Sequence, residues 1–365
     1  IVGPEAPLVN GVVDAFEAQG LRCFGPSAAA ARLEGSKAFS KDFLARHGIP
    51  TAAYATFEAL EPALAYLRER GAPIVVKADG LAAGKGVIVA ETLEQAEAAV
   101  TDMHSVKAFG DAGCSVVIEE FLAGEEASFI VIADGLTALP MATSQDHKRV
   151  GDGDTGPNTG GMGAYSPAPV VDDAVHARIM REVIEPTLRG MTSEGNPYRG
   201  FLYAGLMIAP DGSPKVIEFN CRFGDPETQP IMMRLQSDLV ALCNAAMDGE
   251  LAATDAQWDA RAALGVVLAA GGYPGDYDTG LRIEGLDAAQ AQDANSKIFH
   301  AGTALQDESI VTSGGRVLCV TALGSDIREA RQRCYAALEG VRFAGMQYRS
   351  DIGWRALERY SQVDP

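Results

Sequence analysis

The chain has 365 residues, of which 47% are hydrophobic and 22% are charged. This composition suits two or three globular cores and excludes bulk disorder. The net charge is −19, and no Lys/Arg-rich run is present, so nucleic acid is not an expected partner. No apolar run approaches the ~18 residues that a membrane helix needs, and no membrane partner is expected.

Cysteine and histidine usage argues against a structural metal site. The six cysteines and five histidines show neither C-x-x-C nor H-E-x-x-H spacing. No signal peptide is recognisable at the start of the chain. We therefore expect reduced thiols and a cytoplasmic location.

The first residues are expected to belong to a doubly wound α/β domain. Ile1-Val2 has the character of a strand end, an apolar helical stripe runs from Leu8 to Phe16, and a second strand is predicted at 21–24. One helix with two strand pieces is too small to be stable alone. We expect that an N-terminal part of this domain is missing.

The remaining elements follow from periodicity and punctuation. A helix at 36–47 places Lys37 and Lys41 on one stripe and ends before Gly48 and Pro50. Thr92 and Gln95 have capping-box spacing. Further helices are predicted at 63–70, 175–188, 235–247 and 327–338, and strands at 74–77, 87–90, 116–119, 128–133, 202–208, 214–220, 266–270, 296–300 and 317–322.

A glycine-rich segment at 77–87 is the strongest chemical signal. It contains Gly84, Lys85 and Gly86, and bare N–H groups with a lysine are typical of phosphate binding. Three residues separate Gly80 from Gly84, and Gly86 stands where a Walker A loop has Ser or Thr. The segment lies between two predicted strands, so we expect a hairpin that folds over a triphosphate as a lid.

The segment 218–227 combines an acid, an amide and a guanidinium on one strand. Residues two apart on a strand share a face, so Glu218, Asn220 and Arg222 are expected to point together. Carboxylate and amide oxygens suit Mg²⁺. Arg222 beside them is suited to clamping a phosphate or a carboxylate.

Two further segments have the composition of a site. The strand at 116–119 ends in acids followed by Phe121 and Leu122, and such a backbone can pair with an adenine edge, while Glu126 can accept ribose hydroxyls. The long stretch 143–167 is predicted to be irregular, and long loops of this kind are often functional. A solvated acidic turn and a surface loop are the respective alternatives.

Taken together, these motifs resemble the ATP-grasp fold, and in detail the phosphoribosylamine–glycine ligase family. The resemblance is carried by segments 3–8, 34–37, 77–87, 145–149, 158–163 and 218–227, and it extends from residue 1 to about 357. The Q-D-H-K-R and N-T-G-G-M-G segments point to this family in particular. The family has a longer N-terminal part with a Gly-rich loop for phosphoribosylamine, of which only the Gly3-Pro4-Glu5 corner is expected here.

The resemblance implies an α/β (α+β) chain: an ATP-grasp fold with a partial doubly wound N-terminal domain and a β-rich C-terminal domain. It implies domains at 1–35, 36–255 and 256–360, with a lid subdomain at about 54–119. It implies ATP and Mg²⁺ or Mn²⁺ as cofactors, small-molecule partners, and a monomer or weak homodimer.

The resemblance also assigns residues to ligands. ATP contacts are expected from Lys37, Lys77, Gly84, Lys85, Gly86, Glu119, Glu120, Phe121, Leu122 and Glu126. Metal contacts are expected from Glu218 and Asn220. Glycine and phosphoribosylamine contacts are expected from Glu5, Asp146, His147, Lys148, Gly160, Gly161, Arg222, Asp225 and Pro226, and catalytic roles from Arg222, Asp146 and Lys85.

The implied reaction joins glycine to 5-phosphoribosylamine through glycyl phosphate, giving glycinamide ribonucleotide, ADP and phosphate. Asp146 and His147 are both candidates for taking the amine proton. Two alternatives stay open: another ATP-grasp carboxylate–amine ligase or carboxylase, and an ATP-binding module that is catalytically impaired.

Overall fold

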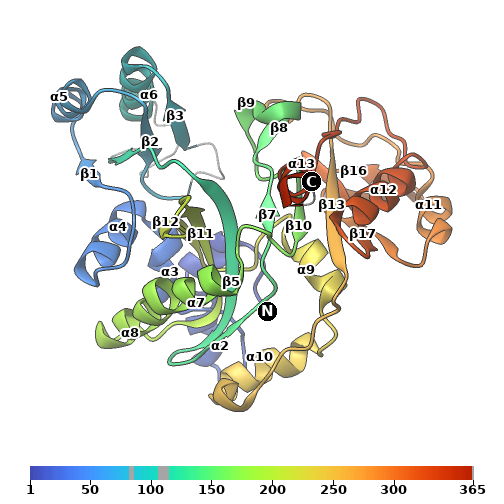
Figure 1. The fold of residues 1–365 in the computed structure, drawn as a ribbon, viewed down its shortest axis with the longest axis horizontal. Coiled ribbons are helices and arrows are strands. Elements are labelled where there is room, and N and C mark those ends of the chain that lie inside the picture. Colours follow the sequence, from blue (N-terminus) through green and yellow to red (C-terminus); the bar gives the residue numbers. More distant parts are fainter. Residues whose placement is uncertain (82–85, 106–114, 364–365) are drawn as a thin grey trace. The chain divides into compact units, whose positions relative to one another are not determined.

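The computed structural model describes residues 1–81, 86–105 and 115–363 (Figure 1). Two of the predicted lid residues, Gly84 and Lys85, lie outside this range. The chain forms two compact units, the first from Ile1–Pro140, Val170–Phe223 and Val240–Asp255, the second from Met141–Pro169, Gly224–Leu239 and Ala256–Pro365. No helix in the described part of the chain combines the length and apolar character needed to cross a membrane.

The first unit contains two four-stranded sheets. One has the order β1-β4-β2-β3 and the other the order β12-β11-β5-β6, and all their pairings are antiparallel. The strands are β1 (Tyr54–Phe57), β2 (Ile74–Ala78), β3 (Val87–Ala90), β4 (Val116–Glu120), β5 (Glu125–Asp134), β6 (Ala138–Pro140), β11 (Arg199–Ile208) and β12 (Pro214–Asn220).

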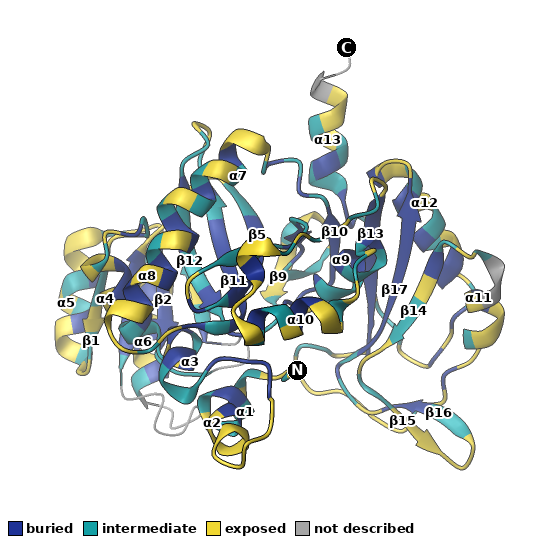
Figure 2. Ribbon diagram, turned by 90° about the horizontal axis from the view of Figure 1, so that it is seen from below, coloured by how far each residue is buried: buried dark blue, intermediate teal, exposed yellow. Residues whose placement is uncertain are grey.

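Helices cover both sheets of this unit. Helices α5 (Leu60–Arg70) and α6 (Leu93–Ser105) pack with β2 and β4 around a small apolar core, and the predicted cap of α6 forms, with Gln95 N donating to Thr92 Oγ1. Strands β5 and β11 are buried along most of their length (Figure 2). The other helices are α1 (Glu5–Val9), α2 (Val12–Glu17), α3 (Ala28–Gly35), α4 (Lys37–Arg46), α7 (Asp173–Ile179), α8 (Glu185–Ser193), α10 (Leu239–Asp248) and the 3-10 turn η4 (Leu251–Ala253).

The second unit is built on a five-stranded sheet of order β14-β17-β13-β10-β7. Strands β13 and β17 are almost entirely buried (Figure 2) and share a core with α12. Its strands are β7 (Gln145–Asp146), β8 (Arg149–Gly151), β9 (Thr155–Asn158), β10 (Gly163–Ser166), β13 (Ala262–Ala269), β14 (Ser296–His300), β15 (Thr303–Gln306), β16 (Ser309–Thr312) and β17 (Arg316–Gly324). Its helices are the 3-10 turn η2 (Asp152–Asp154), α9 (Thr228–Arg234), α11 (Leu286–Gln292), α12 (Ile327–Leu338) and α13 (Trp354–Val363).

Several predicted elements differ from the structure. Residues 1–2 and 21–24 form no strand, because they share a single backbone hydrogen bond, Val2 N to Phe24 O at 3.4 Å. The predicted N-terminal helix is broken at Gly11, whose φ of +82° cannot continue a right-handed helix. The stretch 143–167 is less irregular than predicted, since it holds β7 to β10.

Two predicted helices are also interrupted. Between α7 and α8 a π-helical turn, Met180–Ile184, precedes Pro186, which has no amide hydrogen for the regular helical bond. The helix predicted at 235–247 starts only at Leu239, because Leu235 is extended (φ −69°, ψ 123°).

Candidate functional site

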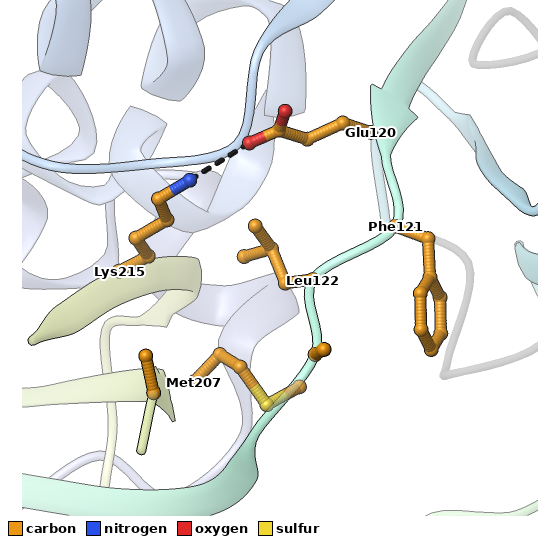
Figure 3. Close-up of a pocket in the computed structure, with 7 residues that line it drawn as sticks. Glu120, Phe121, Leu122, Met207 and Lys215 are labelled. Atoms are coloured by element: carbon orange, nitrogen blue, oxygen red, sulfur yellow. Dashed lines mark hydrogen bonds and ion pairs between the residues drawn. The ribbon is translucent and has the colours of Figure 1, made fainter. Parts of the chain in front are cut away.

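A pocket of about 210 Å³ lies in the first unit, between the segment that follows β4 and strands β11 and β12. It is lined by Glu120, Phe121, Leu122, Ala123, Met207, Ala209 and Lys215. Glu120 and Lys215 point toward each other and form an ion pair of 2.9 Å (Figure 3). Phe121 and Leu122 point to opposite sides of their segment (Figure 3). Three residues predicted to contact ATP, Glu120, Phe121 and Leu122, thus line one pocket. Met207 and Lys215 also line it, and no sequence motif indicated them.

The start of β5 places a further predicted residue opposite one that lines this pocket. Glu126 is the register partner of Met207, which lines the pocket. Gly124, just before, has φ +151°, and a Cβ at this position would lie 2.3 Å from the Ile208 carbonyl oxygen. Only glycine fits this approach to β11, so the turn from the pocket segment into β5 depends on it.

Two lysines predicted to contact phosphate lie near the base of the lid hairpin. Strands β2 and β3 form the predicted antiparallel pair, and Ala78 N donates to Gly86 O at 2.8 Å. Lys37 is the first residue of α4, which Ser36 caps through its hydroxyl, and Lys37 Nζ donates to Gly80 O at 2.8 Å. Burial lowers the pKa of Lys37.

Lys77, Glu119 and Lys41 form a buried ion cluster. Glu119 Oε1 lies 2.9 Å from Lys77 Nζ, and Oε2 lies 2.7 Å from Lys41 Nζ. All three side chains are at most 4% exposed. The resemblance assigned Glu119 to ATP contacts and did not assign Lys41. Only the spacing of four residues between Lys37 and Lys41 on α4 could have indicated Lys41.

The predicted metal pair lies on the face of β12. Glu218 and Asn220 are two residues apart, and their register partners on β11 are Gly205 and Tyr203. They supply one carboxylate and one amide oxygen, which are hard donors. The described residues contain no group of three or more His, Cys, Asp and Glu able to hold a metal. The donor set therefore fits a Mg²⁺ or Mn²⁺ ion that takes its other ligands from phosphate and water.

Arg222 lies between two acids of the N-terminal helices. Its Nε donates to Glu5 Oε2 at 3.2 Å, and its Nη2 lies 3.6 Å from Glu34 Oε1 and donates to Asn220 Oδ1 at 3.3 Å. Glu34 is buried, and burial raises its pKa to about 7, against the lowering effect of Arg222. Asn220 and Arg222 thus contact each other, as their spacing on the strand predicted, and Glu5 and Glu34 join them.

In the second unit, the two loop motifs of 143–167 bind each other. Thr159 N donates to Lys148 O at 2.7 Å, and Met162 N donates to His147 O at 2.8 Å. Asp146 is almost fully buried, and its register partner is Ala164. The Q-D-H-K-R and N-T-G-G-M-G segments are therefore adjacent strands and turns of one substructure.

His147 is fully buried in this substructure. Its Nε2 accepts a hydrogen bond of 3.3 Å from Gly353 N, and Nδ1 has no hydrogen-bond partner among the described residues. Burial, with the nearby cations Arg355 and Arg349, lowers the pKa of His147 to about 3. The imidazole is therefore neutral at neutral pH, and Asp146 and His147 both stay candidates for taking the amine proton. The predicted contact of His147 with substrate stays a prediction.

Arg316 gathers the remaining predicted substrate residues of this unit. Its guanidinium donates to Gly160 O at 2.8 Å, to Asp225 O at 2.7 Å and to Asp225 Oδ2 at 2.9 Å. Gly161 has φ +113°, and a Cβ there would lie 2.3 Å from Pro226 Cδ. Gly160, Gly161, Asp225 and Pro226 therefore form one compact corner, which sequence spacing could not reveal.

Family models match nearly the whole chain. Residues 1–34 match the N domain of phosphoribosylglycinamide synthetase, residues 35–228 its ATP-grasp (A) domain, and residues 263–355 its C domain. The phosphoribosylamine–glycine ligases of Vibrio cholerae and of Escherichia coli K12 are each 69% identical, over 98% of this chain and 83% of theirs.

Solved structures agree with these matches. The crystal structure of phosphoribosylamine–glycine ligase from Thermotoga maritima has a TM-score of 0.79 and 37% identity, covering 90% of this chain and 81% of that one. Biotin carboxylase from Campylobacter jejuni shares the fold at 17% identity, with a TM-score of 0.72 and coverage of 97% and 81%.

Proposed function

The chain belongs to the phosphoribosylamine–glycine ligase family, and from this premise we propose how its residues divide the reaction. It is an ATP-grasp ligase that joins glycine to phosphoribosylamine in purine biosynthesis. ATP and a divalent metal are its cofactors, and we propose Mg²⁺, with Mn²⁺ as a substitute. We keep the domain bounds 1–35, 36–255 and 256–360, which the ranges of the three family models support. Within the second domain we also keep the proposed lid subdomain at about 54–119.

The order of groups along β12 carries the assignment of the nucleotide site. Lys215 lines the apolar pocket, the Ile217 carbonyl accepts from Lys77 at 3.0 Å, and Glu218 and Asn220 follow. A strand advances about 3.3 Å per residue, so these groups are spread over roughly 16 Å. We assign the pocket to adenine and Glu126 to ribose. We assign Lys37 and Lys77 to phosphate, and Glu218 and Asn220 to the metal.

The proposed chemistry has two steps. A glycine carboxylate oxygen attacks the γ-phosphorus, the bond to the bridging oxygen of ADP breaks, and glycyl phosphate forms. The amine of phosphoribosylamine then attacks the glycyl carbonyl, the amide bond forms, phosphate leaves, and the nitrogen gives up a proton. A bound Mg²⁺ neutralises charge on the phosphate oxygens.

This chain's own residues position and neutralise the reactants. Lys37 and Lys77 place fixed cations beside the phosphate groups, where they cost no reorganisation during the reaction. Arg222, held by Glu5, is suited to the carboxylate of glycine or the phosphate of phosphoribosylamine. Asp146 is proposed as the acceptor of the amine proton.

The residues of the second unit complete the proposal. We assign His147, Lys148, Gly160, Gly161, Asp225 and Pro226 to the binding of glycine and phosphoribosylamine. The backbone hydrogen bonds and the Arg316 corner described above support this assignment, since they preorganise the segments.

The partners and the location of the protein are also proposed. Small molecules are the proposed partners of a monomer or weak homodimer. A cytoplasmic location is supported by the cysteines, since those in the described residues are all free.

The test is ADP release by the chain with Mg·ATP and glycine. Phosphoribosylamine is generated in place from ribose 5-phosphate and ammonia, and each co-substrate is left out in turn. Release that needs both co-substrates is the expected result. Release with an amino acid other than glycine, or without phosphoribosylamine at the full rate, would contradict the assignment.

A further inference from the structure

One buried carboxylate is shared by two buried lysines at the junction of the two sheets of the first unit. This carboxylate belongs to Glu119, which is only 3% exposed, and Lys41 and Lys77 are equally buried. Lys41 Nζ is 2.7 Å from Oε2. Lys77 Nζ is 2.9 Å from Oε1, but Oε1 accepts no hydrogen bond from the described residues. Glu119 is therefore held more firmly by Lys41 than by Lys77.

Both lysines are also tied to β12. Lys41 Nζ donates to Thr51 Oγ1 at 2.7 Å, and Thr51 Oγ1 donates to the Val216 carbonyl at 2.6 Å. Lys77 Nζ donates to the Ile217 carbonyl at 3.0 Å. The cluster thus fixes α4, β2 and β4 on the strand that carries the proposed metal pair.

The charges of the cluster do not cancel. Two ammonium groups and one carboxylate leave one positive charge buried, and burial of a net charge is unfavourable unless an anion compensates it. Burial is the main cause that lowers the pKa of Lys41 to about 8, opposed by Glu119. At pH 7 Lys41 is still mostly charged.

Other charged groups near the cluster are already engaged. Glu120 is paired with Lys215, Lys37 Nζ donates to the Gly80 carbonyl, and the charges of Glu218 and Asp79 act to raise the pKa of Lys37. On β1, the Tyr54 hydroxyl donates to Asp42. Within the described residues near the cluster, no further carboxylate is paired with Lys41 or Lys77. An anion that reaches Lys77 can therefore balance the excess charge.

We propose that Lys41 is a positioning residue for ATP: it keeps Glu119 ionised and in place, so that the charge of Lys77 is available to the phosphate groups. The proposal rests on the proposed function, in which Lys77 contacts phosphate. Without Lys41, Lys77 and Glu119 form a neutral pair. Phosphate then draws Lys77 away only if Glu119 takes up a proton, because an unpaired buried carboxylate is strongly disfavoured.

The test is calorimetric titration of the whole chain with Mg·ATP at pH 7, in two buffers of different ionisation enthalpy, which yields the number of protons bound. For Lys41→Met we expect about one proton more than for wild type, and a Kd about tenfold higher, the scale of one charged hydrogen bond. Because binding takes up a proton, the affinity of the variant falls further between pH 7 and 8, while wild type lacks this extra fall.

A matched control removes an ion pair elsewhere in the same unit. Arg68 Nε is 2.7 Å from Glu97 Oε1 on the packed pair α5 and α6. Arg68→Met is expected to keep the wild-type proton number and Kd. The double variant Lys41→Met with Glu119→Gln is expected to lose the extra proton, since no carboxylate is left to titrate.

The outcomes separate this proposal from the proposed function. Wild type that fails to bind Mg·ATP overturns the nucleotide site itself. Wild type that binds, with a Lys41→Met variant of equal proton number and Kd, overturns the role of Lys41 alone. If Lys41→Met does not fold, Lys41→Gln removes the charge and retains a donor, and the same two readouts decide.

Discussion

The backbone N–H of Cys221 donates a hydrogen bond of 2.6 Å to Glu34 Oε2, which ties helix α3 to the residue after β12. The same carboxylate lies 3.6 Å from Arg222 through Oε1. Glu34 therefore connects the N-terminal helices to the end of the strand that carries the proposed metal pair. This connection joins residues 187 positions apart, and it fixes the position of the backbone from which the Arg222 side chain extends.

The protonation of Glu34 gives the first prediction. Burial raises its pKa from 4.5 to about 7, so the folded chain binds more protons than the unfolded chain between these values, and its stability falls as pH rises through this window. Glu34→Gln removes the titrating carboxyl group, and with it the loss of stability as the pH rises. We expect the variant to gain about 2 to 3 kcal/mol relative to wild type between pH 5 and pH 8.

Urea unfolding of both proteins at the two pH values measures this difference. Glu17→Gln on α2 is the control, because its side chain is half exposed. A Glu34→Gln variant whose stability relative to wild type does not change with pH would contradict a raised pKa.

The metal pair gives the second prediction. Glu218→Ala is expected to lower metal-dependent turnover by at least ~10²-fold, the scale of one preorganised electrostatic group. Glu182→Ala is the control: it removes an acid of the π-helical turn that pairs with Arg178 of α7, and it should leave turnover unchanged. ADP release across a Mg²⁺ titration is the measurement, and near wild-type turnover of Glu218→Ala would refute the assignment of the metal.

The third prediction concerns Gly161 and its neighbour Pro226. In Gly161→Ala the new Cβ would lie 2.3 Å from Pro226 Cδ at φ +113°, so the substrate corner must shift. We expect a loss of at least about tenfold in kcat/KM, since displaced positioning groups are costly. Gly153→Ala serves as the control. Gly153 also has a positive φ, +65°, but open space surrounds it, so this substitution introduces backbone strain without a steric clash. Equal activity of the two variants would argue against a role of this corner in positioning the substrates.

The fourth prediction concerns Arg349, whose side chain is fully buried between two acids. Its Nη1 is 2.7 Å from Asp154 Oδ1, and its Nε is 2.7 Å from Asp351 Oδ1. Arg349→Met leaves Asp351 without its guanidinium partner and Asp154 with Arg355 alone, and it should destabilise the second unit by about 3 kcal/mol. Because Arg349 also donates to Arg149 O, the Q-D-H-K-R segment should lose order.

Chemical denaturation monitored by fluorescence tests this effect. Arg333→Met on α12 is the matched control: it removes an arginine that also pairs with two acids but is open to solvent, so its effect on stability should be clearly smaller. Similar costs for the two variants would show that burial of the Arg349 network is unimportant.

Local patterns predicted much of the fold. Strands β3, β12 and β14 and helix α12 have the bounds that alternation and helical periodicity indicated, and the lid strands pair as expected. The failures lie where one residue overrides a pattern. Gly11 breaks a helical stripe through its backbone angle, and Pro186 forces a π-turn through its missing amide. The spacing of apolar residues indicates neither a positive φ angle nor a missing amide hydrogen.

The sequence by itself determined the elements and the identity of the reacting groups, because periodicity and motif spacing act between neighbours along the chain. Only the tertiary structure decided which charges meet. Lys41 reaches Glu119, Arg316 reaches Asp225, and Arg349 reaches Asp154 across 195 positions. Such pairs depend on coordinates that arise when sheets and helices pack, and buried charges must then find partners wherever the fold places them.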